Sequence, residues 1–330
     1  MRVLVIGGTK FLGPFVVEEL LRRGHQVALF HRRQAQLEWA GSVAQIYGEA
    51  KDAKALSVAA EQVGAEALVD LVHCCREEAA AVAAAMQGRL QRSVHVSCAS
   101  VYAPEALAPV LEEAPTVGSG GREGAGVDAL AKAQADEVVL EAAQAGRLSA
   151  VVVRLAPAYG PRSTRPLEWF LVKRALEGRL RIALPDGGVE LWHRGFVQNL
   201  AFGIGQALER SRIVGEVFNL GDERAPTLRQ LTEMIGEALG HRWEIFSVPG
   251  QRWRFPPSGL RRGPALLDLH KAKEKLRYRD LIKARDALEI TVAWVCQNRE
   301  RVERACQGEG WFDYAAEEAV IAAHGVALGG

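Results

Sequence analysis

The chain has 330 residues, of which 48% are hydrophobic and 25% charged, and its formal net charge is +1. This composition is typical of a soluble globular protein of one or two domains, and it does not favour nucleic acid or an anionic membrane surface as a partner. No apolar run approaches the ~20 residues that span a bilayer, and the N-terminus is typical of a strand rather than a signal peptide. The five cysteines show neither CxxC nor His-rich spacing, which predicts a reducing, cytoplasmic location without a disulfide framework or a metal site.

The first predicted strand, Val3–Ile6, runs into a glycine turn and then into a helix that extends from about Leu12 to Arg23. Glycines in such a turn let backbone N–H groups approach a pyrophosphate, and the N-terminus of the helix adds a partial positive charge. The turn therefore predicts a dinucleotide site, although the same glycines also suit an ordinary, tightly packed turn between a strand and a helix. The residues predicted to contact the cofactor here are Gly7, Gly8, Thr9, Lys10, Phe11, Leu12 and Gly13.

The second predicted strand, Gln26–Phe30, ends in the basic run His31, Arg32 and Arg33. A site that prefers NAD usually has an acidic residue here for the ribose 2′-hydroxyl, whereas arginine favours a 2′-phosphate. No acidic residue follows within the next few positions, and Lys10 adds a cation beside the expected phosphates. We therefore predict NADP(H) in preference to NAD(H); the alternative is that Arg32 and Arg33 lie in a solvated loop.

Strands and helices continue to alternate through the first half of the chain, with strands predicted at residues 43–47, 67–72, 93–97 and 150–154 and helices at 51–62, 77–86 and 128–143. Because these strands are continuous apolar runs, we expect them to be parallel and covered on both faces, as in a Rossmann-type, doubly wound α/β sheet. Residues 1–160, with about 195–222, are assigned to this domain, and residues 161–330 mainly to a smaller C-terminal α/β substrate domain. The glycine-dense segment 116–126 predicts a flexible loop, with or without a role in closing a site.

The pattern is less regular in the second half. Helices are predicted at residues 166–177, 196–209, 268–276 and 284–299, strands at 181–184 and 216–220, and a turn at 185–188. Thr227 and Gln230 form a capping-box pattern that opens a further helix, which Gly240 ends. The alanine-rich end, residues 311–330, is expected to be helical up to its glycines.

Several motifs together resemble the extended short-chain dehydrogenase/reductase superfamily, specifically its NAD-dependent epimerase/dehydratase branch, over residues 1–298. The motifs are GGTKFLG (7–13), VSCASVY (96–102), a lysine-bearing helix at Lys132, VVVRLAPAYGPR (151–162), WHRGFVQNLA (192–201), VFNLGD (217–222) and DLHKAKEKLRY (268–278). The GGTKF form of the turn resembles the atypical members, which include chloroplast stem-loop-binding proteins and many uncharacterised bacterial epimerase-like proteins. The resemblance implies hydride transfer to or from a nicotinamide. It also implies a YxxxK tyrosine as acid or base, a Ser or Thr that polarises the substrate oxygen, and a lysine that also binds the nicotinamide ribose.

The chain departs from this pattern at the positions of the family's catalytic residues. If Lys132 is the family's lysine, Asp128 stands where the tyrosine belongs, and Cys98 stands at the Ser/Thr position between Ser97 and Ser100. The Asp128 carboxylate beside Lys132 should stay ionised. It could act as a base, make the lysine inactive through a salt bridge, or simply be the first acidic residue of a helix. Cys98 could be core packing, a weak substrate contact or a more nucleophilic thiolate. We predict Cys98, Ser100, Asp128 and Lys132 as the catalytic group.

Other residues take their predicted roles from position. Val72 ends the predicted fourth strand, and His73 and Cys74 come next beside the expected cofactor, whereas His95 within the fifth strand is typical of a structural histidine. The family's pattern places Pro157 and Ala158 against the nicotinamide, and Ser97, Tyr159 and Arg194 at the substrate. Arg194 could hold a substrate phosphate or form an inter-domain salt bridge.

The sequence thus favours an NADP(H)-dependent, epimerase/dehydratase-like oxidoreductase with an atypical acid/base site. Its substrate is expected to be a small molecule, anionic or sugar-like, and relatives suggest a homodimer through the helices at 77–86 and 128–143. Two alternatives are a redox-neutral enzyme that reuses the pocket for proton transfer or cyclisation, and a non-enzymatic nucleotide-sensing or RNA-associated protein.

Overall fold

A seven-stranded parallel sheet forms one half of the molecule in the computed structural model, which describes residues 1–32, 43–118, 127–210, 212–253, 266–307 and 310–329. The strand order is β10-β6-β5-β4-β1-β2-β3, and every pair of neighbours is parallel. The strands are β1 (Arg2–Ile6), β2 (Gln26–His31), β3 (Ala44–Tyr47), β4 (Ala67–Asp70), β5 (Arg92–Cys98), β6 (Ala150–Leu155) and β10 (Val217–Leu220). The predicted α/β fold with a Rossmann-type, doubly wound parallel sheet is therefore confirmed.

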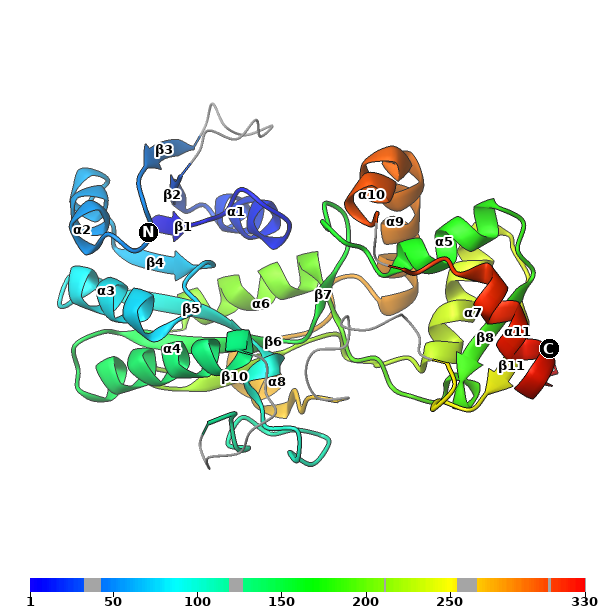
Figure 1. The fold of residues 1–330 in the computed structure, drawn as a ribbon. Coiled ribbons are helices and arrows are strands. Elements are labelled where there is room, and N and C mark those ends of the chain that lie inside the picture. The colour runs from blue at the N-terminus through cyan, green and yellow to red at the C-terminus, as the bar shows by residue number, and fades with distance from the viewer. Residues whose placement is uncertain (33–42, 119–126, 211, 254–265, 308–309, 330) are drawn as a thin grey trace.

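Helices cover both faces of this sheet (Figure 1). One face packs on α1 (Leu12–Arg22), α6 (Val197–Glu209) and α8 (His270–Leu276), and the other on α2 (Ala53–Gln62), α3 (Arg76–Met86) and α4 (Val127–Gln144). Successive side chains of a strand point to opposite faces, so Val3 and Val5 of β1 enter the first core and Leu4 and Ile6 the second. Burial on both faces explains why these strands are continuous apolar runs.

The smaller half, on the right of Figure 1, is built around a three-stranded sheet of β8 (Arg181–Pro185), β11 (Glu244–Val248) and β12 (Val326–Ala327). Its helices are α5 (Glu168–Leu176), α7 (Leu228–Leu239), α9 (Ala284–Gln297), α10 (Arg299–Ala305) and α11 (Tyr314–His324). Two-residue strands β7 (Ala158–Tyr159) and β9 (Gly195–Phe196) pair between the two halves. The capping box is present, because Thr227 and Gln230 bond each other's backbone N–H groups and Gly240 ends α7 with φ 63°.

The second half departs from the predicted elements in several places. The strand β11 was not predicted, and the helix predicted at 284–299 stops at Gln297, with the short α10 beyond it. The expected C-terminal helix is present as α11 and ends before Gly325 as predicted, but the chain after it pairs as β12 with β11. Most of the predicted glycine loop lies outside the described residues (119–126), and the division of the chain into domains stays a prediction. Among the residues described, no helix is both long and apolar enough to cross a bilayer.

Candidate active site

The turn between β1 and α1 has the shape of a phosphate cradle. Gly7 and Gly8 have φ values of 93° and 83°, which residues with a side chain rarely adopt. A Cβ on Gly13 would lie 2.5 Å from Cα of Gly8, so only glycine lets the helix approach the turn this closely. Within the described residues no side chain caps α1, and its first turn has no acidic residue. The helix N-terminus is therefore available to an anion, and the residues present fit a dinucleotide.

Of the basic residues predicted beside this turn, two are exposed to solvent and one is buried. Lys10 and Arg32 are both exposed at the carboxyl-terminal edge of β1 and β2. His31 is buried, with Nε2 3.2 Å from Oε1 of Gln45 and its ring edge-on to Tyr47. Arg33 lies outside the described residues. Lys10 and Arg32 are thus the two cations in the described part of this edge that remain candidates for a 2′-phosphate.

The segment after β4 is organised by Asp70. One carboxylate oxygen, Oδ1, accepts hydrogen bonds from the backbone N–H groups of Val72 and His73 and lies 2.7 Å from Nδ1 of His73. Nε2 of His73 lies 2.8 Å from the carbonyl of Ala50, and the side chain has no exposed surface. His73 can therefore reach a bound cofactor only through its backbone, whereas Val72 is exposed and covers Gly7.

A cavity of about 520 Å³ opens where β5 and β6 end and α4 begins. Eight of the predicted site residues line it: Cys74, Ser97, Cys98, Ser100, Asp128, Lys132, Pro157 and Ala158. Sγ of Cys98 lies 2.7 Å from Oγ of Ser100, so one of these groups donates a hydrogen bond to the other. The structure therefore brings the predicted catalytic group together with the predicted nicotinamide contacts, while the roles of these residues stay predictions.

No tyrosine lines this cavity in the described part of the chain. Two buried tyrosines are close in sequence to residues that line the cavity, but their hydroxyl groups bond other side chains. Tyr102 donates to Oδ1 of Asn219 at 2.7 Å, and Tyr159 donates to Oδ2 of Asp222 at 2.7 Å. Burial raises the pKa of Tyr102 to about 12. Neither hydroxyl is placed to replace the missing YxxxK tyrosine.

Beneath the cavity lies a buried ionic network that the sequence did not reveal. The ring of His95 lies between Asp70 (Nδ1 to Oδ2, 3.3 Å) and Asp136 (Nε2 to Oδ1, 3.5 Å). Arg154 donates from Nε to Oδ2 of Asp136 at 2.9 Å. Burial raises the pKa of Asp136, but its contacts with His95, Arg154 and Ser97 hold that pKa below its ordinary value. Ser97 thus lines the cavity, while its buried hydroxyl lies against the Asp136 carboxylate.

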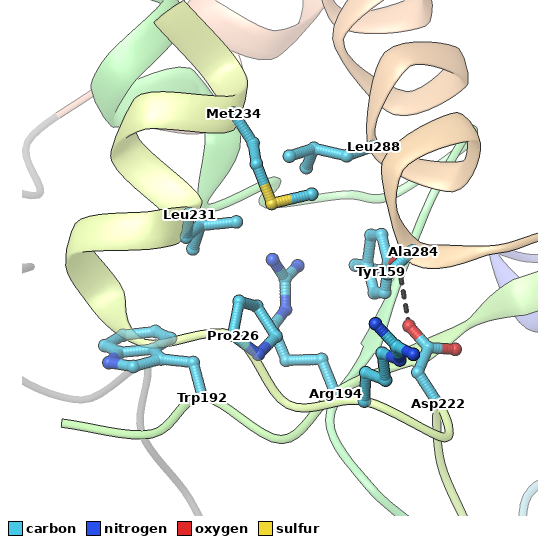
Figure 2. A pocket seen from close by; sticks show the side chains of 10 residues that line it. Tyr159, Trp192, Arg194, Asp222, Pro226, Leu231, Met234, Ala284 and Leu288 are labelled. Carbon is cyan, nitrogen blue, oxygen red and sulfur yellow. Dashed lines mark hydrogen bonds between the residues drawn. The ribbon is translucent and has the colours of Figure 1, made fainter. Parts of the chain in front are cut away.

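On the substrate side, Figure 2 shows a hollow between α7 and α9, whose side chains Leu231, Met234 and Leu288 converge on it. Trp192 and Tyr159 also line this hollow, with the Tyr159–Asp222 hydrogen bond at its edge. Arg194 lies over the ring of Tyr159, 4.4 Å from the ring centre, and donates from Nη1 to Oε1 of Glu168 at 2.6 Å. Glu168, which sequence reasoning did not single out, is almost completely buried.

Comparisons with known proteins agree with this architecture. A model of the NAD dependent epimerase/dehydratase family matches residues 3–221. The chain is 23% identical over 252 residues to the chloroplast stem-loop binding protein of 41 kDa b from Arabidopsis thaliana, covering 72% of this chain but only 63% of that relative. It thus spans less than two-thirds of that relative's length. A 4-hydroxy-2-methyl-3-oxo-4-farnesyl-3,4-dihydroquinoline-1-oxide ketoreductase from Stigmatella aurantiaca is 31% identical over 270 residues, covering 77% of this chain and 78% of the relative.

A solved structure shares the fold. The dTDP-glucose 4,6-dehydratase of Bacillus anthracis, determined in complex with NAD, superposes with a TM-score of 0.74 over 92% of this chain and 99% of that one, at 21% sequence identity.

Proposed function

Since this chain belongs to the NAD dependent epimerase/dehydratase family, we propose that it is an NADP(H)-dependent oxidoreductase that reduces a carbonyl group of a small molecule at an atypical acid/base site. The observation that carries this proposal is the cavity in which Cys98, Ser100, Asp128 and Lys132 meet beside Pro157 and Ala158. The similarity to a ketoreductase supports reduction of a ketone over epimerisation.

The glycine turn would hold the cofactor's pyrophosphate through backbone N–H groups at the start of α1, and Lys10 and Arg32 would hold the 2′-phosphate. When bound, a nicotinamide dinucleotide supplies the hydride. Exposed arginine and lysine side chains bind a phosphate through charge-assisted hydrogen bonds, so the preference for NADP(H) should weaken with salt.

The groups of the cavity would then act on the substrate oxygen. The Lys132 ammonium stabilises the negative charge that develops on this oxygen and donates the proton that completes the alcohol. The Ser100 hydroxyl or the Cys98 thiol, which already bond each other, donates a second hydrogen bond. Asp128 lies one helical turn before Lys132 in α4, so the two residues share one face of the helix.

Calorimetric titration of the nucleotide-stripped protein with NADPH, NADP, NADH and NAD tests the cofactor half of the proposal. We expect phosphate-dependent binding, and equal affinities for the phosphorylated and unphosphorylated forms would contradict the NADP(H) preference. NADPH consumption with a panel of ketones, aldehydes and sugar nucleotides tests the chemistry.

Matched variants assign the chemistry to the cavity. Lys132→Met should lower turnover at least about a hundredfold, as loss of a general acid does, whereas Lys54→Met on the exposed face of α2 should not change it. Tight NADPH binding without turnover on any substrate would favour the redox-neutral alternative. Absence of nucleotide binding together with retention of a structured RNA would favour the RNA-associated one.

A further inference from the structure

We propose that the hollow between α7 and α9 binds the non-reacting part of the substrate, and that this part is an apolar body carrying one anionic group held by Arg224. This inference rests on the proposed function, because the molecule concerned is the carbonyl compound reduced in the neighbouring cavity. The two cavities are lined by neighbouring residues of β7: Ala158 lines the first and Tyr159 the second.

The hollow is mainly apolar. Trp192, Leu231, Met234 and Leu288 surround it, contributed by the chain before β9, by α7 and by α9 (Figure 2). By itself the hollow offers about 20 Å³, so a bound group must extend into the adjoining cavity of about 1240 Å³, with which the hollow shares Arg224, Pro226, Met234 and Ala284. An aromatic or aliphatic group fits such a lining, whereas the hydroxyl groups of a sugar would lose hydrogen bonds to water without replacement.

Arg194, for which the sequence left open a substrate phosphate or a salt bridge, is held in an ion pair in this structure. Its Nη1 is 2.6 Å from Glu168, and the two side chains are only 11% and 1% exposed. Turning Arg194 toward a substrate anion would leave the Glu168 carboxylate buried without its partner, which is strongly unfavourable. The pair fixes the wall of the hollow instead.

Arg224 is the cation that remains available. It lines both cavities, is exposed, and makes no ion pair with any residue that the structure describes. The other cations of the larger cavity each lie beside a carboxylate: Lys273 and Lys283 lie 3.1 and 3.0 Å from Glu223, and Arg285 pairs with Glu237. One free guanidinium next to an apolar wall suits one carboxylate on an apolar body better than a diphosphate, which needs several donors.

Binding of 2-naphthoate, 2-naphthamide and dTDP-glucose to the cofactor-free protein tests the proposal, measured by calorimetry and by quenching of tryptophan fluorescence. We expect 2-naphthoate to bind at least about tenfold more tightly than the other two, as expected for one charge-assisted contact. Arg224→Gln should weaken 2-naphthoate about tenfold and leave 2-naphthamide unchanged.

Two further variants make the result specific. Arg285→Gln removes a cation of the same cavity that is already paired, so it should change 2-naphthoate affinity by less than about twofold. Met234→Glu should weaken both naphthalene probes, and circular dichroism checks that it folds. Tighter binding of dTDP-glucose than of 2-naphthoate, or unchanged 2-naphthoate affinity in Arg224→Gln, would overturn the proposal. Because no nicotinamide cofactor is present, these outcomes are independent of whether the protein binds NADPH or transfers a hydride.

Discussion

The Nδ1 atom of His95 lies 3.3 Å from Oδ2 of Asp70, and both side chains are buried in the sheet beneath the candidate active site. The opposite edge of the same ring faces Asp136, which Arg154 also contacts. Burial lowers the pKa of His95, but its interactions with Asp136 and Asp70 raise it to about 9. The imidazolium therefore separates two buried carboxylates, and the charges alternate across β4, β5, α4 and β6.

Replacing His95 by glutamine should lower the free energy of unfolding by roughly 3 kcal/mol at pH 7, because two buried carboxylates lose the cation between them. Urea denaturation of the wild type and the variant measures this difference. His270→Gln is the matched control: that ring is 83% exposed beside Glu274, and its loss should be almost without effect.

The pH dependence gives a second readout of the same histidine. Its folded pKa of about 9 is above the ordinary value of 6.5, so its stabilising contribution is complete below pH 6.5 and is lost as the pH rises through 9. The difference in the free energy of unfolding between the wild type and His95→Gln should therefore be smaller at pH 10 than at pH 7. An equal difference in the free energy of unfolding at both pH values would show that the ring acts by packing rather than by charge.

The cradle glycine Gly13 should not tolerate even one methyl group. Its Cβ would lie 2.5 Å from Cα of Gly8, so in Gly13→Ala either the turn or the start of α1 must move. We expect a loss of about 2 kcal/mol of stability from overpacking and at least about tenfold weaker NADPH binding. Gly24→Ala is the control, because it meets no atom within 4 Å and should cost about 1 kcal/mol through its positive φ alone, without changing nucleotide binding.

Local signals explain why so much of the first half could be predicted. Apolar runs and the glycine turn are contiguous in sequence, and the carboxyl ends of parallel strands meet at one edge of the sheet. The grouping of Cys98, Lys132 and Pro157 at that edge followed from the resemblance to the family's motifs. The contacts that were not foreseen join residues far apart in sequence. No sequence pattern near His95 predicts its contacts with Asp70 and Asp136. None near Arg194 predicts its ion pair with Glu168, which is 26 positions away. The strand β12 has only two residues, too few for a pattern, and exists through pairing with β11.

Lys10 and Arg32 should account for any preference for NADPH over NADH. Each exposed cation adds a charge-assisted contact to a 2′-phosphate, so Lys10→Ala and Arg32→Ala should each weaken NADPH about tenfold and leave NADH unchanged. Calorimetry at two salt concentrations measures both effects, and the wild-type preference should fall at the higher salt. Equal losses for NADPH and NADH would indicate that these side chains support the fold of the turn rather than the phosphate.

Alkylation of cysteines can show where a nucleotide binds without requiring turnover. Cys74 and Cys98 line the candidate active-site cavity, whereas Cys296 lies on α9. Burial raises the pKa of the Cys74 thiol, the positive charge of Lys132 opposes this shift, and Glu78 adds to it. Iodoacetamide should therefore label Cys74 slowly at neutral pH and faster as the pH rises toward and beyond 9, because the thiolate is the reacting form.

Saturating NADPH should protect Cys74 and Cys98 but not Cys296, as followed by mass spectrometry of the digested protein. Lys132→Met should slow labelling of Cys74 at a fixed pH without nucleotide, since removing the nearby cation raises the thiol pKa further. Protection of all three cysteines would point to a general tightening of the protein. Protection of none, at a concentration at which calorimetry shows binding, would place the nucleotide away from this cavity and remove the basis for assigning Lys132 and Cys98 to catalysis.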